Sequence, residues 1–253
     1  MAEETLPIPP ELSTEKTLRI FLSYSHLDKV LAGQIKLFLE FYFGLDVFLA
    51  HDDLIPPQDW REVIIERIKS TDIFMPLLTE NFKSSDFTDQ ESGMAHAYGK
   101  KIISLIVELN PYGFLEKYQA FKFDRSEVFE SCESLLAVLI DGSPEYKENL
   151  TDCLLRALSR CSSWSAAAAE VGLLEKIKLD SEKISELINT YLLNENIHGS
   201  FQARPVFERI VKRASADLDT TLLEKFKEKV KENEQRLKEV KEQKKKEKEE
   251  IPF

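Results

Sequence analysis

Glycine is scarce in this sequence, and its scarcity excludes the common nucleotide-binding loops. The 253 residues include only 8 glycines. Neither GxGxxG nor GxxxxGK[ST] occurs, so there is no Rossmann dinucleotide fingerprint and no P-loop. The GxSxG elbow of α/β-hydrolases is also absent. Any nucleotide would therefore have to be bound by other means, such as aromatic stacking and helix N-termini.

Cysteine and histidine are few as well. Cys132, Cys153 and Cys161 are odd in number and lack CxxC spacing, and the chain has 4 His. Neither a disulfide framework nor a zinc site is indicated, so we expect no metal and no cofactor. No apolar stretch reaches the length of a transmembrane helix, and the acidic, Pro-rich start MAEETLPIPPELSTEK does not have the features of a signal peptide. We therefore expect a cytoplasmic protein with no membrane contact.

Positive charge is also limited. The sequence has 34 Lys and Arg against 45 Asp and Glu, and its formal net charge is −11. Such a balance argues against nonspecific nucleic-acid binding, and no nucleic-acid partner is expected. The charge is unevenly distributed, because residues 224–250 hold 11 Lys or Arg and 9 Asp or Glu. The rest of the chain therefore carries a net charge of −13.

Five short apolar runs predict strands, with helical patterns between them. The runs are residues 18–24, 45–50, 72–78, 101–107 and a weaker one at 120–124. Alternating strands and helices predict parallel βαβ units and a doubly wound α/β sheet. Sites in such sheets lie beyond the carboxyl ends of the strands, which here means the loops after Tyr24, Ala50 and Leu78.

The strand signals end at Ser143, and amphipathic helical segments follow. We divide the chain into a disordered segment 1–15, an α/β domain 16–142, an all-α adaptor or regulatory domain 143–216 and a charged helical tail 217–253. In the tail, one set of residues has the spacing of a coiled-coil seam: Leu223, Phe226, Val230, Asn233, Leu237 and Val240. The seam has too few heptads for a sustained coiled coil, so a solvated helix is the favoured interpretation.

The basic residues near the end of the last helix before the tail have two interpretations. They are Arg204, Arg209, Lys212 and Arg213. They can bind an anion or form a solvated face, and the acidic body of the chain favours the solvated face.

The stretch SSDFTDQESGMAHA at residues 84–97 has one glutamate, Glu91, about one turn inside a predicted helix. Thr88-x-x-Glu91 fits a capping box, in which the glutamate reaches back to the backbone of the cap residue. If the helix begins earlier, with Ser85 as its cap, the Glu91 side chain is available to a ligand. The segment alone leaves both interpretations open.

Several motifs, taken in order, resemble the Toll/interleukin-1 receptor (TIR) domain family. They are RIFLSYSHLDK, GLDVFLAHDDLIPPQDW, KSTDIFMPLLTENF and SSDFTDQE, and the resemblance covers about residues 16–142. It implies a flavodoxin-like fold and, in the enzymatic branch, cleavage of NAD+ at the nicotinamide–ribose bond. That branch has a glutamate four residues after an aromatic residue, as Phe87 and Glu91 are here. The sequence departs from the family pattern at Pro56-Pro57, where Pro-Gly is usual, and at Ser25-His26, where an arginine often stands.

The resemblance and the chemistry together make Glu91 the candidate catalytic residue. Nicotinamide in NAD+ is already cationic and leaves without an acid, so one carboxylate that stabilises an oxocarbenium-like state can suffice. The candidate binding residues are Tyr24, Trp60 and Phe87 for stacking, and Ser25 and His26 for phosphate or ribose. Each aromatic residue is at least as readily explained as part of the core.

The leading hypothesis is a TIR-domain NAD+ glycohydrolase that hydrolyses or cyclises NAD+ as a substrate, an immune or defence effector activated by assembly. The alternative is a non-catalytic TIR adaptor that acts by homotypic contacts, in which Glu91 is only a helix cap. In either case we expect self-association through the TIR domain. Residues 143–253 are the expected contact for a helical protein partner.

Overall fold

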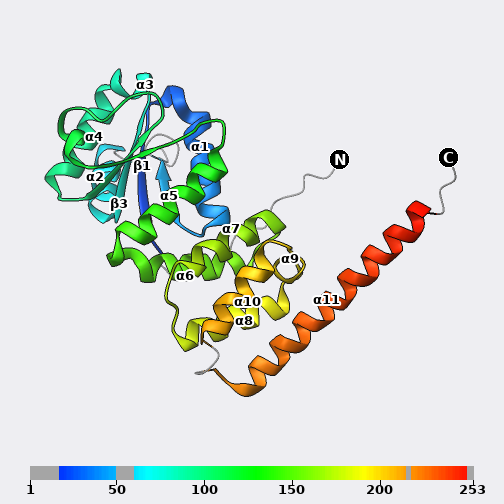
Figure 1. The fold of residues 1–253 in the computed structure, drawn as a ribbon. Helices are drawn as coiled ribbons and strands as arrows, with labels where there is room; N and C mark the ends of the chain where they lie inside the picture. The colour runs from blue at the N-terminus through cyan, green and yellow to red at the C-terminus, as the bar shows by residue number, and fades with distance from the viewer. Residues whose placement is uncertain (1–16, 50–59, 215–217, 250–253) are drawn as a thin grey trace, which may run out of the picture. The chain divides into compact units, whose positions relative to one another are not determined.

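The computed structural model describes residues 17–49, 60–214 and 218–249, and the chain divides into two compact units (Figure 1). Among the described residues, the first unit takes 17–36, 45–49, 60–123 and 148–153. The second unit takes 37–44, 124–147, 154–214 and 218–249. The predicted disordered segment 1–15 lies outside the described residues.

The first unit is built on a five-stranded sheet with the order β2-β1-β3-β4-β5. The strands are β1 (Arg19–Ser23), β2 (Asp46–Leu49), β3 (Ile73–Leu78), β4 (Lys101–Ile106) and β5 (Gln119–Lys122). All neighbouring strands pair in parallel, and each strand overlaps a run predicted from the sequence. The order 2-1-3-4-5 is that of flavodoxin-like doubly wound sheets, so the predicted fold class is confirmed.

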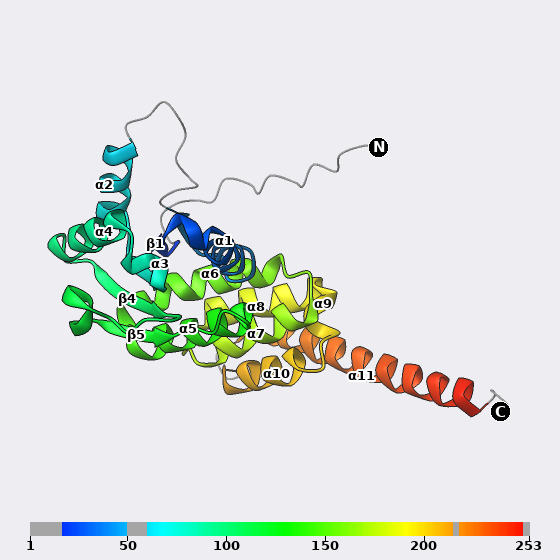
Figure 2. The same cartoon turned by 90° about the horizontal axis from the view of Figure 1, so that it is seen from above.

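Helices lie on both faces of this sheet. Helix α1 (Lys29–Leu37) lies on one side, and α2 (Trp60–Ser70) and α4 (Asp86–Ala97) lie on the other (Figures 1 and 2). A short helix, α3 (Glu80–Lys83), connects β3 to α4, and the 3₁₀ turn η2 (His26–Asp28) precedes α1. The remaining turn of this unit is η4 (Gly113–Lys117), between β4 and β5.

An aromatic core fills the space between the sheet and the α2 and α4 side. The Phe21 ring lies 5.3 Å from that of Phe48 and 5.4 Å from that of Phe74, measured between centroids. Buried Ile64 and Ile68 of α2 belong to the same cluster. Since alternate strand residues point to the same face, Ser23 shares the face of Phe21 but stands at the carboxyl end of β1.

The opposite, amino end of the sheet is held by an ion pair. Asp72 accepts a hydrogen bond of 2.8 Å from the backbone N–H of Arg19, and its Oδ1 lies 3.1 Å from Nη2 of the Arg19 side chain. The Thr71 hydroxyl lies 3.0 Å from the carbonyl oxygen of Arg19. The residues that enter the third strand therefore fix its register against the first.

The C-terminal half of the chain is helical throughout the described residues. Its helices are α5 (Val128–Gly142), α6 (Lys147–Ser159), α7 (Trp164–Glu175), α8 (Ser181–Leu193), α9 (Glu195–His198), α10 (Ala203–Ala214) and α11 (Thr220–Glu249), with a 3₁₀ turn η5 (Pro144–Tyr146). The second unit also takes the π-helical turn η3 (Phe38–Tyr42). Within it, the rings of Phe38 and Phe129 meet edge to face, so α5 packs on η3.

The first half of α11 packs inside the second unit. The Phe226 ring lies 5.0 Å from Tyr191 and 5.8 Å from Phe207 between centroids, and Asn233 is buried. The favoured expectation of a solvated tail is therefore wrong for this part, because Phe226 and Asn233 are buried in a contact within their own chain. Val240, further along, is exposed.

Candidate functional site

Helix α4 begins early enough to exclude the predicted capping box. Its N-cap is Ser85, so the earlier start is confirmed. The Thr88 hydroxyl lies 2.7 Å from the carbonyl oxygens of both Phe82 and Ser85, so it points away from the amides that a capping residue would bind. The side chain of Glu91 has its partner elsewhere. Glu91 is therefore not a capping residue.

Glu91 lies on the buried face of α4, among small side chains. The buried positions of the helix are Thr88, Glu91, Ser92 and Ala95, which have the spacing of one helical face. The Ser92 hydroxyl donates a hydrogen bond of 2.8 Å to the Thr88 carbonyl. Glu91 is only 2% exposed. A carboxyl group thus occupies a core position, where the charged form is costly.

One hydrogen bond holds this carboxyl against the sheet. The Ser23 hydroxyl donates to Oε2 of Glu91 at 2.6 Å, and Ser23 is wholly buried. The other carboxyl oxygen, Oε1, is buried and has no hydrogen-bond partner among the described residues. The carboxyl end of β1 therefore contacts α4 through the Glu91 carboxyl group, of which only one oxygen, Oε2, has a hydrogen-bond partner among the described residues.

The environment of Glu91 shifts its titration towards neutrality. Burial raises the pKa of Glu91 to about 7, and the hydrogen bond from Ser23 acts in the opposite direction. Near neutral pH the carboxyl is therefore divided between its protonated and ionised forms. A carboxyl that titrates near pH 7 is typical of acid–base and electrostatic roles in catalysis.

The remaining predicted site residues fall in different environments. Phe87 is 46% exposed and lies four residues before Glu91, on the same side of α4. Tyr24 is wholly buried, so its ring belongs to the core and is not presented to a ligand. Ser25 is buried, with its carbonyl accepting from the N–H of Asp28 at 2.7 Å, and His26 is exposed.

Two sequence expectations fall outside the described residues. Trp60 begins α2, but its side chain is not among those described. The loop 51–59, with its Pro56-Pro57 pair, is also outside them.

The structure brings Glu91 together with Ser23, which the sequence interpretation missed. The signal that could have found Ser23 is its strand register, two residues after Phe21 on the same face.

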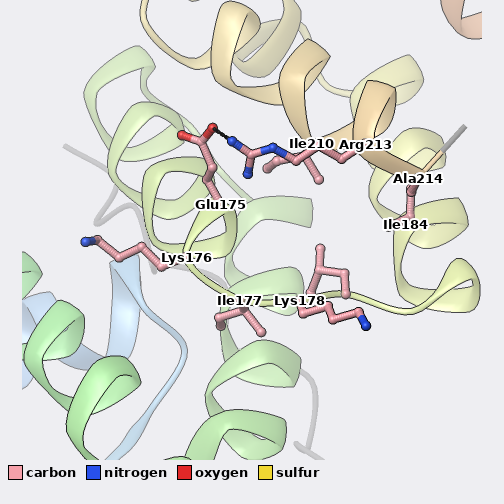
Figure 3. Close-up of a pocket in the computed structure, with 9 residues that line it drawn as sticks. Glu175, Lys176, Ile177, Lys178, Ile184, Ile210, Arg213 and Ala214 are labelled. Carbon is pink, nitrogen blue, oxygen red and sulfur yellow. Dashed lines mark hydrogen bonds and ion pairs between the residues drawn. The ribbon is translucent and has the colours of Figure 1, made fainter.

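The second unit contains a pocket of about 440 Å³ (Figure 3). It is lined by Glu175, Lys176, Ile177, Lys178, Leu179, Ile184, Ile210, Arg213 and Ala214. Arg213 is one of the basic residues considered for anion binding, and the other lining residues are not candidate site residues.

Arginines of α10 pair with carboxylates, one of which, Glu175, lines this pocket. Arg209 donates two hydrogen bonds to Glu175, of 2.8 and 2.9 Å, and Arg213 donates one of 3.2 Å. Arg204 forms an ion pair with Glu208 at 3.6 Å. Arg204, Arg209 and Arg213, which were considered for anion binding, are therefore matched by carboxylates.

Two further findings concern the part of the chain that the structure describes. There, no group of three or more His, Cys, Asp or Glu is arranged to hold a metal ion. Over the same residues, no helix combines the length and apolar content needed to cross a membrane.

The fold and site define a doubly wound α/β domain with a buried carboxyl at the carboxyl edge of its sheet. Residues 20–136 match the family model described as the TIR domain, so this part of the chain is a TIR domain. Among solved structures, the chain is similar to a CMP N-glycosidase, BcmB, from Clostridium botulinum. The identity is 26% and the TM-score is 0.34, over 46% of this chain and 97% of that one. No curated protein matches the chain.

Proposed function

We propose that the TIR domain cleaves NAD+ at the nicotinamide–ribose bond, with Glu91 as the catalytic carboxylate. The observation that carries this proposal is the buried Glu91 carboxyl at the carboxyl edge of the sheet. One of its oxygens is held by Ser23, and the other has no partner among the described residues. Doubly wound sheets bind ligands at this edge.

The chemistry needs little from the protein beyond one negative charge. As the C1′–N bond breaks, the bonding electron pair moves to the nicotinamide nitrogen, which loses its positive charge, and C1′ becomes an oxocarbenium-like centre. Ionised Glu91 stabilises this centre and accepts hydrogen bonds from ribose hydroxyls at Oε1. Water then adds to C1′ and releases one proton, giving ADP-ribose and nicotinamide. Attack by a nitrogen of the adenine ring instead gives a cyclic product.

Burial of Glu91 serves this chemistry in a specific way. In a water-poor site, a fixed charge interacts more strongly with a developing cation than it does in bulk water. The Ser23 bond holds Oε2, which leaves Oε1 as the oxygen for the substrate. The fraction of substrate-free protein in which Glu91 is ionised then sets the activity near neutral pH.

The binding roles are assigned to candidates that the sequence indicated. Phe87 and Trp60 are proposed to stack on the rings of NAD+, and Ser25 and His26 to contact its phosphates and sugars. NAD+ is the substrate in this scheme, and no cofactor takes part. The three cysteines are buried thiols, which accords with the reducing cytosol as the proposed compartment.

An NAD+-consuming domain needs control, so we propose that it is an immune or defence effector whose activity depends on assembly of TIR domains. The helical second unit and tail are proposed to regulate this assembly or to bind a helical protein partner. The alternative function is a non-catalytic adaptor, in which Glu91 has only a capping role. The hydrogen bond of Glu91 to Ser23 in place of a backbone amide does not favour that alternative.

The test is nicotinamide release from NAD+ by the purified protein at high concentration. We expect release by the unmodified chain and none by Glu91→Ala or Glu91→Gln. Asp86→Asn is the matched control, because Asp86 is an exposed carboxylate one turn earlier on the same helix. Equal release by Glu91→Gln and the unmodified chain would exclude the catalytic role of Glu91.

A further inference from the structure

Asp28 is a second buried carboxylate at this edge of the sheet. It is 7% exposed and lies in η2, between β1 and α1. Both of its oxygens accept from the loop that follows β3. The Thr79 hydroxyl donates to Oδ2 at 2.6 Å, and the Asn81 amide donates to Oδ1 at 3.0 Å. Asp28 therefore ties together the loops that follow two neighbouring strands.

On one side of this link, Asp28 belongs to the turn that carries two candidate binding residues. Its backbone N–H donates to the Ser25 carbonyl at 2.7 Å and so closes the turn around His26. A displacement of Asp28 would therefore move Ser25 and His26 as well.

On the other side, a series of contacts leads from Asp28 to the helix that carries Glu91. The Thr79 hydroxyl also accepts from the Phe82 N–H at 3.0 Å and so caps α3. The Phe82 carbonyl in turn lies 2.7 Å from the Thr88 hydroxyl of α4. Thr88 is one turn before Glu91, so the start of α4 is positioned through this series.

The carboxylate form of Asp28 suits this role for a chemical reason. Both partners, a hydroxyl and an amide N–H, act as donors, and a carboxylate offers two acceptor oxygens. An asparagine would offer one acceptor and one donor, so it would accept from only one of the two partners and present an N–H to the other. The Thr79 hydroxyl donates to Asp28 and accepts from the Phe82 N–H, so it takes part in both contacts.

We propose that Asp28 is a positioning residue for the cleavage reaction. Through Thr79 and Asn81 it holds the Ser25–His26 turn and the Glu91 helix in one relative arrangement, so that a bound substrate faces Glu91. This inference rests on the proposed function. Asp28 itself is not proposed to touch the substrate.

The predicted effect of breaking the link is a loss of alignment. Misplacement of catalytic groups by about 1 Å lowers rates by about 100-fold. We therefore expect Asp28→Asn to lower kcat by between about 10-fold and 100-fold. The Ser23–Glu91 bond stays intact in this variant, so the pH at which activity rises should not move. A general loss of folding would instead lower the active fraction and leave kcat per active site unchanged.

The variants to compare are Asp28→Asn, Thr79→Val and Thr79→Ser, at a temperature at which thermal melts show all of them folded. Thr79→Ser keeps the hydroxyl and should retain most of kcat, whereas Thr79→Val should behave like Asp28→Asn. Asp72→Asn is the matched control, because it breaks a carboxylate link between the same two strands at the opposite end of the sheet. Equal kcat in Asp28→Asn and Asp72→Asn would overturn the proposal.

Hydrogen exchange supplies a readout that does not depend on activity. Asp28→Asn should speed the exchange of amides in residues 79–92, and Asp72→Asn should not. If the unmodified chain releases no nicotinamide, the proposed function fails, and the exchange data alone decide whether Asp28 positions the Glu91 helix. Unchanged exchange in that segment would show that it does not.

Discussion

The hydroxyl of Ser23 at the end of β1 donates a 2.6 Å hydrogen bond to the carboxyl of Glu91 on α4, 68 residues further along the chain. Both side chains are buried. The bond gives the carboxyl a fixed orientation, and it opposes the rise in pKa that burial causes. It therefore affects both the geometry and the charge of Glu91.

Removal of this bond should move the pH dependence of activity. The pKa of Glu91 in the unmodified chain is about 7, and the proposed NAD+ cleavage needs the ionised form, so kcat/KM should rise with pH through about 7. Ser23→Ala removes the donor that favours ionisation. A hydrogen bond worth about 1.4 kcal/mol corresponds to about one pH unit, so the rise should move to higher pH by about that amount.

The control for this measurement is Ser92→Ala. Ser92 is a buried serine on the same helix, but its hydroxyl donates to the Thr88 carbonyl and not to Glu91. Profiles of kcat/KM between pH 5 and 9 should match the unmodified chain for Ser92→Ala only. If Ser23→Ala also matches it, the bond does not control the ionisation of Glu91.

Glu91→Gln should stabilise the folded protein at alkaline pH while it abolishes activity. The folded-state pKa of Glu91 is raised from 4.5 to about 7, so the folded protein binds this proton more tightly than the unfolded chain. The unmodified chain therefore loses stability as pH rises from about 4.5 to about 7, by roughly 3 kcal/mol in total. Glutamine has no titrating proton, so its variant avoids this loss of unfolding free energy. The net gain is reduced by the cost of burying the glutamine amide.

Unfolding free energies measured at pH 5 and pH 8 test this linkage. The difference between Glu91→Gln and the unmodified chain should be small at pH 5 and should favour the variant at pH 8. Asp86→Asn, at an exposed position, should show no such change. A difference of the same size at both pH values would mean that Glu91 does not titrate near neutrality.

The sheet was predictable from the sequence, because buried parallel strands form short apolar runs that need no tertiary information. All five strands were found in this way. The tail shows the limit of the method, since its three-and-four spacing is the same whether the partner helix belongs to another chain or to this one. Phe226 and Asn233 are buried in an intrachain contact, a result that spacing cannot reveal.

The site was harder to predict than the sheet. Ser85 and Thr88 both fit as caps in the sequence, and the choice depends on where the Thr88 hydroxyl points in three dimensions. Ser23 was missed because its partner is 68 residues away. Tyr24 was a candidate for stacking because it follows a strand end, but it is wholly buried.

Phe87 should contribute to substrate binding more than to the chemical step. An aromatic stacking contact worth about 1.4 kcal/mol corresponds to a tenfold change in affinity, so Phe87→Ala should raise KM about tenfold with a smaller change in kcat. Phe87→Trp keeps an aromatic face and should retain a low KM. Phe114→Ala is the control, because this exposed ring stacks on His96 instead. If both alanine variants leave KM unchanged, Phe87 does not stack on the substrate.

Activity per molecule should rise with protein concentration. The proposed site has one carboxylate with an unsatisfied oxygen, and the sequence has no Gly-rich phosphate loop, so closure by a neighbouring TIR domain would exclude water and complete it. Nicotinamide release and light scattering should be followed together over two decades of concentration. A constant specific activity across that range would contradict dependence on assembly.

Truncation of the tail before Asn233 should lower the stability of the helical unit, whereas truncation after Asn233 should leave it unchanged. A chain that ends at Asp219 loses Phe226, whose ring packs on Tyr191 and Phe207. Removal of one buried phenylalanine side chain costs about 3 to 5 kcal/mol, so the helical unit should unfold more readily. A chain that ends at Arg236 keeps Leu223, Phe226 and Asn233, and the described side chains that it loses (Lys238, Glu239, Val240 and Glu242) are exposed. Its stability should stay within about 0.5 kcal/mol of that of the 253-residue chain.

Light scattering and thermal melts on both truncated chains separate packing from association. The point variant Phe226→Ala should destabilise the helical unit as the shorter truncation does, and Val240→Ala, at an exposed position, should not. Because Phe226 and Asn233 are already buried within their own chain, the chain that ends at Arg236 should keep its oligomeric state and the proposed NAD+ cleavage. A change of oligomeric state without loss of stability in that chain would instead assign the last part of α11 to contacts between molecules.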